Sequence, residues 1–487
     1  MSWTRILGVL AAAGVVGAGG CAVGPDYHSP SVRVPATWTS PRDNGLTEAA
    51  GEAPAWWTLF NDAELDSLIQ RAAQSNPDLR VAEAHLRQAR AIRQMSAADL
   101  WPTADVTGSF ARARQSQNQP LIGSLPLPPN FPFEYSVYQA GFDASWEIDL
   151  FGGRRRALEA SNAEWEGAIE SRNDVMVSVL AEVARNYVEL RGGQLRLEIA
   201  RRNLKLQEEA VELARARFQT GLVSELDVTR AASLLAGVKA ALPPVEMAVN
   251  GSMYALASLL GLEPGQLLPE LSPSKPMPPV PPEIPIGLPS DLLSRRPDVR
   301  RAERQLAAET ARVGQAKSDW FPKLSLTGDA GQESVTLAKL FEPGSRFWSF
   351  GPSLQWRALD FGRVRAEVQA QTAVQEEALA TYEKTVLNSL EEAENAIVAY
   401  TKEQSRHAAL GEEVAENRRS LDMANGLYGA GRVNYLDVLD AQRSLYQSED
   451  EMAVSAQAAS IDLIALYKAL GGGWEALARD HSNASAS

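Results

Sequence analysis

The stretch Tyr428-Gly-Ala-Gly-Arg-Val-Asn-Tyr-Leu-Asp-Val-Leu-Asp440 places two glycines directly before a helix-like run that carries two acids. A near copy stands upstream as Phe218-Gln-Thr-Gly-Leu-Val-Ser-Glu-Leu-Asp-Val228. Gly431 lies 210 residues after Gly221, and the same spacing aligns the Leu-Asp-Val triplets that follow both glycines. Each copy joins one long helical pattern to another, so we expect two helical hairpins that arose from one duplicated unit.

A second pair of motifs supports the duplication. Asn76-Pro77-Asp78 opens a helical pattern that stops at Trp101-Pro102, since proline suits the first helical position and disfavours helix in the residue before it. The same unit recurs from Arg296-Pro297-Asp298 to Phe321-Pro322, 220 residues later at both ends. The 487 residues therefore indicate one architecture in two halves, with an internal two-fold repeat, rather than a row of separate domains.

After each of these units the hydrophobic period changes from helical to two. The pattern predicts two β-hairpins, 103–149 and 323–358, whose strands have one apolar face and one polar face. A soluble sandwich would alternate in the same way, so the strands alone leave both folds open. Each strand has about the ten residues that a tilted strand needs to cross a bilayer, and we expect no spanning helix, so a membrane barrel is favoured together with the N-terminal features described below. Four strands cannot close a barrel, and open edges are not tolerated in lipid. The chain should therefore assemble, with eight strands from two copies or twelve from three.

The segments after the hairpins stay helical in pattern for an unusual length. From 154 to about 220, and again from 363 to about 428, they contain no proline and would span on the order of 100 Å. A returning helix follows each turn, so we expect long helical hairpins at 153–260 and 362–470. The expected organisation is a first repeat at 61–262, a proline-rich connector at 263–290, a second repeat at 291–471 and a disordered C-terminal tail at 472–487.

The N-terminus has the features of a secreted lipoprotein. An apolar run at 6–16, too short to span a membrane, leads through small residues to Cys21, so 1–20 is a predicted signal peptide. A cysteine at this position predicts acylation, followed by an extended, lipidated segment at 21–60. Ala18 stands where lipoprotein signals usually have leucine, which leaves a plain signal peptide as the alternative.

Composition argues against several kinds of function. A net charge of −14 argues against a nucleic-acid partner, and four scattered histidines with one cysteine give no metal-ligand cluster. Asp360-Phe-Gly362 matches a kinase triplet, but no glycine-rich nucleotide loop accompanies it and its twin Asp149-Leu-Phe-Gly152 indicates a structural turn. We therefore expect no enzyme, no metal and no cofactor other than the covalent lipid on Cys21.

This order of parts resembles the bacterial outer-membrane factor family, the TolC/NodT-like exit ducts of tripartite efflux pumps. The motifs that carry the resemblance are Cys21-Ala-Val-Gly-Pro-Asp-Tyr27, Trp56-Trp57, the paired Pro-Asp units, Asp149-Leu-Phe-Gly152 with Leu359-Asp-Phe-Gly362, and the two tip turns. The resemblance implies a mainly α fold with a membrane β-barrel: a homotrimeric duct with four strands per chain. The resulting twelve-stranded barrel in the outer membrane would continue into a long periplasmic α-helical barrel, with residues 263–290 in a belt around its middle.

The resemblance also implies partners and a gate. A periplasmic adaptor protein would dock on the helical tips, and an inner-membrane pump of the RND type would complete the system. Leu436, Asp437 and Asp440 occupy the positions at which the family closes its periplasmic end. The expected docking residues at the two tips are Gly221, Leu222, Val223, Ser224, Leu226, Asp227, Gly431, Arg432 and Val433.

Local chemistry gives the gate residues a physical basis. Asp437 and Asp440 share one helix face, and three copies of them would form carboxylate rings that attract cations, while Leu436 could add an apolar ring. Asp437 could equally serve to cap its helix, whereas a gate role is favoured for Asp440. For Asp227 we expect a closing hydrogen bond or salt bridge.

The sequence thus predicts a passive outer-membrane duct for drugs or other small molecules, lipid-anchored and barrel-spanning, that extends into the periplasm. Within the same class, an exit duct for secreted protein or for metal ions stays open. A coiled-coil envelope scaffold without a pore is the alternative from a different class.

Overall fold

The computed structural model describes all residues except 1–21, 41–44, 48–54, 118–130, 282 and 478–487. The predicted signal peptide and Cys21 lie outside the described residues. The chain divides into two compact units. Unit 1 comprises Met1–Pro30, Arg87–Glu166 and Glu303–Ala380; unit 2 comprises Ser31–Leu86, Gly167–Ala302 and Thr381–Ser487.

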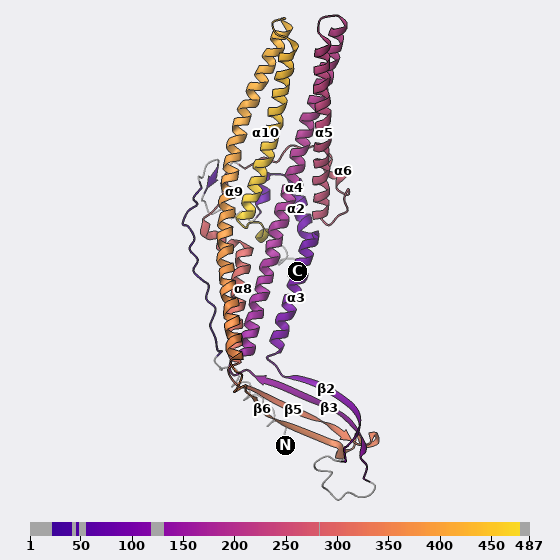
Figure 1. Cartoon of the computed structure of the whole chain (residues 1–487), viewed down its shortest axis with the longest axis vertical. Coiled ribbons are helices and arrows are strands. Elements are labelled where there is room, and N and C mark those ends of the chain that lie inside the picture. The colour runs from indigo at the N-terminus through magenta and orange to yellow at the C-terminus, as the bar shows by residue number, and fades with distance from the viewer. Residues whose placement is uncertain (1–21, 41–44, 48–54, 118–130, 282, 478–487) are drawn as a thin grey trace. The chain divides into compact units, whose positions relative to one another are not determined.

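Unit 1 contains an antiparallel sheet of four strands in the order β2-β3-β5-β6, so β2 and β6 are its edges (Figure 1). The four strands predicted from the sequence are confirmed. Pro352 lies in the edge strand β6, where a proline is tolerated if its nitrogen faces away from the neighbouring strand. The strands are β2 (Thr103–Arg114), β3 (Glu134–Ile148), β5 (Lys323–Ser334) and β6 (Arg346–Gln355).

The two faces of this sheet differ in chemistry. One polar row crosses three strands, with Asp105 opposite Asp143 and Asp143 opposite Asp329. The other face exposes large apolar side chains, although soluble proteins rarely expose contiguous apolar patches of this kind. These exposed side chains are Val106, Phe110, Phe142, Trp348, Phe350 and Leu354.

The N-terminal segment is tied to unit 1 close to the base of the sheet. The Val23 amide donates to the Phe151 carbonyl at 3.0 Å, and the buried Arg156 guanidinium pairs with Asp26 at 2.7 Å. Gly24, at a φ of 101°, lies so close to Gly314 that a Cβ on Gly24 would be 2.3 Å from the Gly314 Cα. Only glycine can keep this contact.

Corresponding helices of the two repeats have the same number of residues. Two long helices have 67 residues each, their returning helices 35 each, and the helices before the sheet strands 22 each. The returning helix of the first hairpin runs through Pro243 and Pro244, although proline disfavours a helix interior. The helices are α3 (Pro77–Ala98), α8 (Pro297–Ser318), α4 (Gly153–Gln219), α5 (Glu225–Leu259), α9 (Arg363–Gly429) and α10 (Tyr435–Ala469).

One helix departs from the expectation that no segment could span a membrane. By length and composition alone, α5 is apolar enough to cross one, and only 11% of its apolar window is buried inside the chain. The low burial means that most of this apolar surface is exposed in the single chain.

Unit 2 holds the main hydrophobic core, which packs around α2 (Ala63–Ser75) and the 3-10 helix η1 (Trp56–Phe60). Trp56 and Leu65 are almost completely buried, and Trp56 stacks on Tyr467 with ring centroids 5.5 Å apart. The paired tryptophans therefore anchor the N-terminal segment to the helices.

The proline-rich connector contributes to this core instead of acting only as a stiff spacer. Its apolar residues fall between the prolines and turn inward; Leu267, Leu271, Ile284 and Ile286 are buried. It also forms the short helices α6 (Leu268–Leu271) and η3 (Pro289–Asp291), while α7 (Leu292–Arg295) follows it. The strand β4 (Ile284–Pro285) pairs in parallel with β1 (Leu46–Thr47).

The predicted disordered tail at 472–487 is wrong for its described part. Residues 474–477 are helical, and Trp474 and Leu477 pack against the unit 2 core. The Trp474 indole also donates to the Arg295 carbonyl at 3.3 Å, because a large aromatic ring with a polar N–H is stabilised by burial with a partner.

Candidate gate at the helical tips

Both helical hairpins of unit 2 turn in the same way. Gly221 and Gly431 have φ values of 75° and 70°, a left-handed conformation that favours glycine. The next amide in each copy donates back across the turn, from Leu222 to the Arg217 carbonyl and from Arg432 to the Leu427 carbonyl, both at 2.9 Å. This bonding satisfies the last carbonyls of a helix and fixes where each hairpin reverses.

The acid three residues after each N-cap belongs to a capping box. The Ser224 amide and hydroxyl donate to the Asp227 carboxylate at 2.9 and 2.7 Å, and these bonds lower the pKa of Asp227. The backbone amide of Asn434 donates to the Asp437 carboxylate at 3.1 Å. In return, the backbone amide of Asp437 donates to the side-chain oxygen of Asn434 at 3.2 Å. Asp437 thus has the capping role that the sequence offered as one of two choices.

In the single chain Asp227 belongs to a local helix cap, and the closing bond expected of it stays a prediction. Its carboxylate accepts from Ser224 at the start of its own helix, and no bond from it to the second hairpin occurs among the described residues. The Ser224 donors are three residues away in sequence and already in place, so the local cap satisfies this acid first.

Asp440 has the freer carboxylate of the predicted gate residues. Its side chain is 65% exposed and lies 3.3 Å from Arg443, one turn further along α10. Asp437 is also exposed, while Leu436 is half-buried. Because the two acids are three residues apart, they stand on one face of α10 and can present charge at two levels.

The predicted docking residues lie on the outside of the two turns. Leu222 is 75% exposed and Leu226 is 55% exposed, so the first turn offers two apolar side chains. The second turn offers the exposed Arg432 at the position of Leu222, and Val223 and Val433 are half-buried. The two tips therefore have the same backbone conformation but differ in the chemistry of their outer surface.

A contact between the hairpins was missed in the sequence. The Arg217 guanidinium from α4 lies over the Tyr428 ring of α9 at 4.6 Å, and that ring lies 5.1 Å from the ring of Tyr435 on α10. Burial raises the pKa of Tyr435. The only signal in the sequence was a basic residue in the last turn of α4, where cations are common at any helix end.

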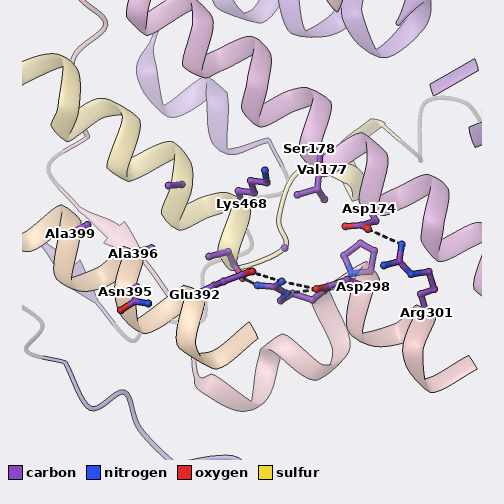
Figure 2. A pocket seen from close by; sticks show the side chains of 15 residues that line it. Asp174, Val177, Ser178, Asp298, Arg301, Glu392, Asn395, Ala396, Ala399 and Lys468 are labelled. Carbon is purple, nitrogen blue, oxygen red and sulfur yellow. Dashed lines mark hydrogen bonds and ion pairs between the residues drawn. The ribbon is translucent and has the colours of Figure 1, made fainter. Parts of the chain in front are cut away.

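A cavity of about 650 Å³ lies further along the same unit, beside the buried Arg296. The guanidinium pairs with Asp298 at 2.7 Å and Glu392 at 2.8 Å, and it donates to the Ala469 carbonyl at 2.9 Å. Figure 2 labels the two partner acids, Asp298 and Glu392, and shows a further ion pair nearby, Arg301 with Asp174 at 2.9 Å.

Five charged side chains that line this cavity are already paired with one another, namely Asp174, Arg296, Asp298, Arg301 and Glu392. Arg296 ties the start of α8 to α9 and to the end of α10, just as its twin Asn76 donates to the Leu259 carbonyl at the end of α5. We interpret the cavity as a joint between helices. Among the described residues, no group of three or more His, Cys, Asp or Glu side chains is arranged to hold a metal ion.

Comparison with known proteins places this architecture. Residues 68–262 and 288–472 match the model of a family described as outer membrane efflux protein. The pyoverdine export outer membrane protein OpmQ of Pseudomonas aeruginosa is 33% identical over 450 residues, covering 90% of this chain and 93% of the relative. Nodulation protein T of Rhizobium leguminosarum bv. trifolii is 30% identical over 461 residues, covering 94% and 96%.

A solved structure agrees in fold. The outer-membrane channel OprN superposes with a TM-score of 0.85 at 36% identity, covering 93% of this chain and all of that one. The match spans both halves of the duplication, and it confirms the fold, the outer-membrane location and the family resemblance that the motifs predicted. The chain therefore belongs to the outer membrane efflux protein family.

Proposed function

We propose that three copies of this outer-membrane efflux channel assemble into one duct that passively exports small organic molecules. Twelve strands would close a barrel in the outer membrane, and the helical hairpins would form a periplasmic barrel with a gate at their tips. The two turns would dock a periplasmic adaptor, and an inner-membrane pump of the RND type would supply the energy.

The observation that carries this proposal is the sheet of unit 1. Its strands are 10 to 15 residues long, and large apolar side chains are exposed over one face while the other face is polar. Within the described part of the single chain, neither of its edges pairs with a further strand. A sheet of this kind is stable in a bilayer only when further strands complete the ring, since unpaired backbone groups are costly in lipid.

The gate is supported by the geometry of α10. Asp437 and Asp440 are exposed on one helix face, close to the turn. Three chains would bring six carboxylates to one opening, where they would attract cations and repel anions. Asp437 would serve both the cap and the gate, because a carboxylate has more acceptor sites than its one bond to the Asn434 amide uses.

The cargo class follows from the family and is part of the proposal. OpmQ is named for the export of pyoverdine, and we assign this chain to small organic molecules of the same kind. Acylation of Cys21 also stays a prediction, which metabolic labelling with palmitate and a Cys21→Ala control would test.

Conductance in planar lipid bilayers tests the pore and its gate together. We expect a small, cation-preferring conductance from the purified full-length protein. Asp440→Ala should raise the conductance and weaken the cation preference, and the double variant Asp437→Ala/Asp440→Ala should do so further. Asp422→Ala, an exposed acid on α9, is the matched control and should leave both unchanged. A protein that forms no pore, or a double variant that behaves like wild type, would contradict the assignment.

A further inference from the structure

The charged residues of the unit 1 sheet are divided between its two faces. Side chains alternate along a strand, and the register pairs even-numbered residues with even-numbered ones, so they share the apolar face of Phe110 and Phe350. Within the four strands the polar face carries Asp105, Asp143, Glu147, Asp329, Glu333 and the cation Lys323. The charged residues of the apolar face are Arg112, Arg114, Arg346 and the acid Glu134.

The charges of the apolar face all lie toward the ends of strands that lead into the hairpin loops. Arg114 ends β2, Glu134 begins β3 and Arg346 begins β6. The opposite ends of the strands lead to the helices, so in the proposed duct these charges lie at the outer surface of the outer membrane. Although the chain has a net charge of −14, this rim is predominantly cationic.

The apolar face has the height of the hydrocarbon core up to the point where the arginine pair of β2 begins. It runs along β3 from Ile148 to Tyr138, a separation of 148 − 138 = 10 residues, which is about 34 Å of strand. In a strand tilted by about 40° this length spans about 26 Å, close to the apolar band of about 25 Å in outer-membrane barrels.

An aromatic pair marks the outer limit of this band. The ring of Tyr138 lies 4.8 Å from the ring of Phe110, and aromatic rings are enriched where a bilayer meets water. Arg112 and Arg114 are the next two residues of β2 on the same face beyond Phe110. They therefore lie at the level of the lipid head groups.

The two arginines of β2 converge on one anionic group. The guanidinium of Arg112 lies 3.1 Å from one carboxylate oxygen of Glu134, and that of Arg114 lies 3.5 Å from the other. The three side chains are 72%, 68% and 50% exposed, so a ligand from outside can reach them. A guanidinium has five N–H donors, and one acid compensates only one of the two positive charges.

Cross-strand pairing alone does not account for both arginines. Arg114 lies directly opposite Glu134, whereas Arg112 lies opposite Ser136. Exposed ion pairs stabilise a fold little, and one arginine is enough to form this one. The second arginine adds positive charge to a surface whose neighbour is lipid.

We propose that Arg112 and Arg114 bind a phosphate group of the phosphorylated glycolipid that forms the outer leaflet of the outer membrane. The phosphate takes the place that the Glu134 carboxylate has between the two guanidiniums in the single chain. A phosphate monoester carries close to two negative charges and three acceptor oxygens, which matches two arginines better than a single carboxylate does. The acyl chains of the same lipid lie along the apolar face beside Phe110.

Native mass spectrometry of the purified full-length protein measures this binding, with lipid A that carries two phosphates as the probe. Arg112→Gln and Arg114→Gln should each weaken binding about tenfold, and the double variant about 100-fold, because each change removes charge-assisted hydrogen bonds. Lys323→Gln is the control, since this cation lies on the polar face at the other end of the sheet, and it should match wild type. A double variant that binds like wild type would overturn the proposal.

Glu134→Gln provides a test that a folding defect cannot imitate. It removes the carboxylate that competes for the two guanidiniums, so the variant should bind the same lipid A more tightly than wild type. Binding that is unchanged or weaker would show that the phosphate does not take the place of the carboxylate, and would refute the assignment.

Two further lipids identify the group that is recognised. Lipid A without its phosphates should bind wild type about 100-fold more weakly, and phosphatidylglycerol, with a single charge on a phosphodiester, about tenfold more weakly. Equal binding of the lipid without phosphates would exclude phosphate recognition. Equal binding of phosphatidylglycerol would show a surface for any anionic lipid and would overturn the assignment to the glycolipid.

This inference rests on the proposed barrel, because the apolar face must contact lipid. Conductance in planar bilayers, measured on the same preparations, separates the two proposals. Wild type and Arg112→Gln/Arg114→Gln should both form pores. Pores without phosphate-dependent lipid binding would overturn this inference alone, whereas a protein that forms no pore would overturn the barrel and this inference with it.

Discussion

The contact of Arg217 with Tyr428 should hold the two helical hairpins together at the tip, and Arg217→Met is the perturbation that tests it. Methionine keeps the length of the side chain and removes the cation that lies 4.6 Å from the Tyr428 ring. Both residues are half-buried, so water screens the interaction only in part. If the tip opens by separating the hairpins, the variant should open more readily.

The expected size follows from the geometry. A cation over an aromatic ring contributes about 0.5–1 kcal/mol when exposed and about 2 kcal/mol when desolvated, so a half-buried pair contributes about 1 kcal/mol. Three chains opening together would lose about 3 kcal/mol. Since 1.4 kcal/mol is a factor of ten, the ratio of open to closed channels should rise about 100-fold.

Single-channel recording in planar bilayers measures that ratio directly as open probability. Arg215→Met is the matched control, because Arg215 is an exposed arginine two positions before Arg217 on α4. A double-mutant cycle with Tyr428→Leu shows whether the two residues act through each other. The contact between Arg217 and Tyr428 does not hold the tip closed if Arg217→Met opens no more often than Arg215→Met, or if the effects of Arg217→Met and Tyr428→Leu simply add.

Three further changes probe the fold around the duct. Arg296→Met leaves the carboxylates of Asp298 and Glu392 without their cation and should lower the free energy of unfolding by about 3 kcal/mol. Arg418→Met, in an exposed pair, should change it by less than about 1 kcal/mol. Denaturant titration measures both free energies. Leu65→Ala opens a cavity in the unit 2 core and should lower the same free energy by about 2–5 kcal/mol. The pKa of Asp227 is lowered in the folded chain, so its capping bonds are present above about pH 4 and are lost as the pH falls through the lowered pKa. Hydrogen exchange at the start of α5 should show this pH response in wild type but not in Asp227→Asn.

The sequence predicted the parts of the fold that are written in local patterns. The repeated Pro-Asp units, the change of period after Pro102 and Pro322, and the two glycine turns each depend on residues close in the chain. Because the chain is duplicated, each of these elements appears twice, and each copy supports the assignment of the other. The four strands and two long hairpins followed from these signals alone.

What the sequence did not predict depends on residues that are distant in the chain. Arg217 and Tyr428 are separated by about half of the chain's length, and nothing in either local pattern pairs them. The burial of Leu271 and Ile284 was hidden by the prolines around them, which suggested a spacer. The packing of Trp474 was hidden in the same way by the polar residues that follow it.

If Cys21 becomes the mature N-terminus, as predicted, the hydrogen bond from Val23 to Phe151 limits how far that terminus can move. Cys21 is two residues before the tied amide, and two residues of extended chain reach about 7 Å. A lipid on Cys21 would therefore stay close to the turn that leads from β3 into α4 and could not diffuse independently in the bilayer. Acyl chains held so close to the sheet would fix the depth of the end of β3 in the membrane. The lipid and this strand would then enter the membrane together.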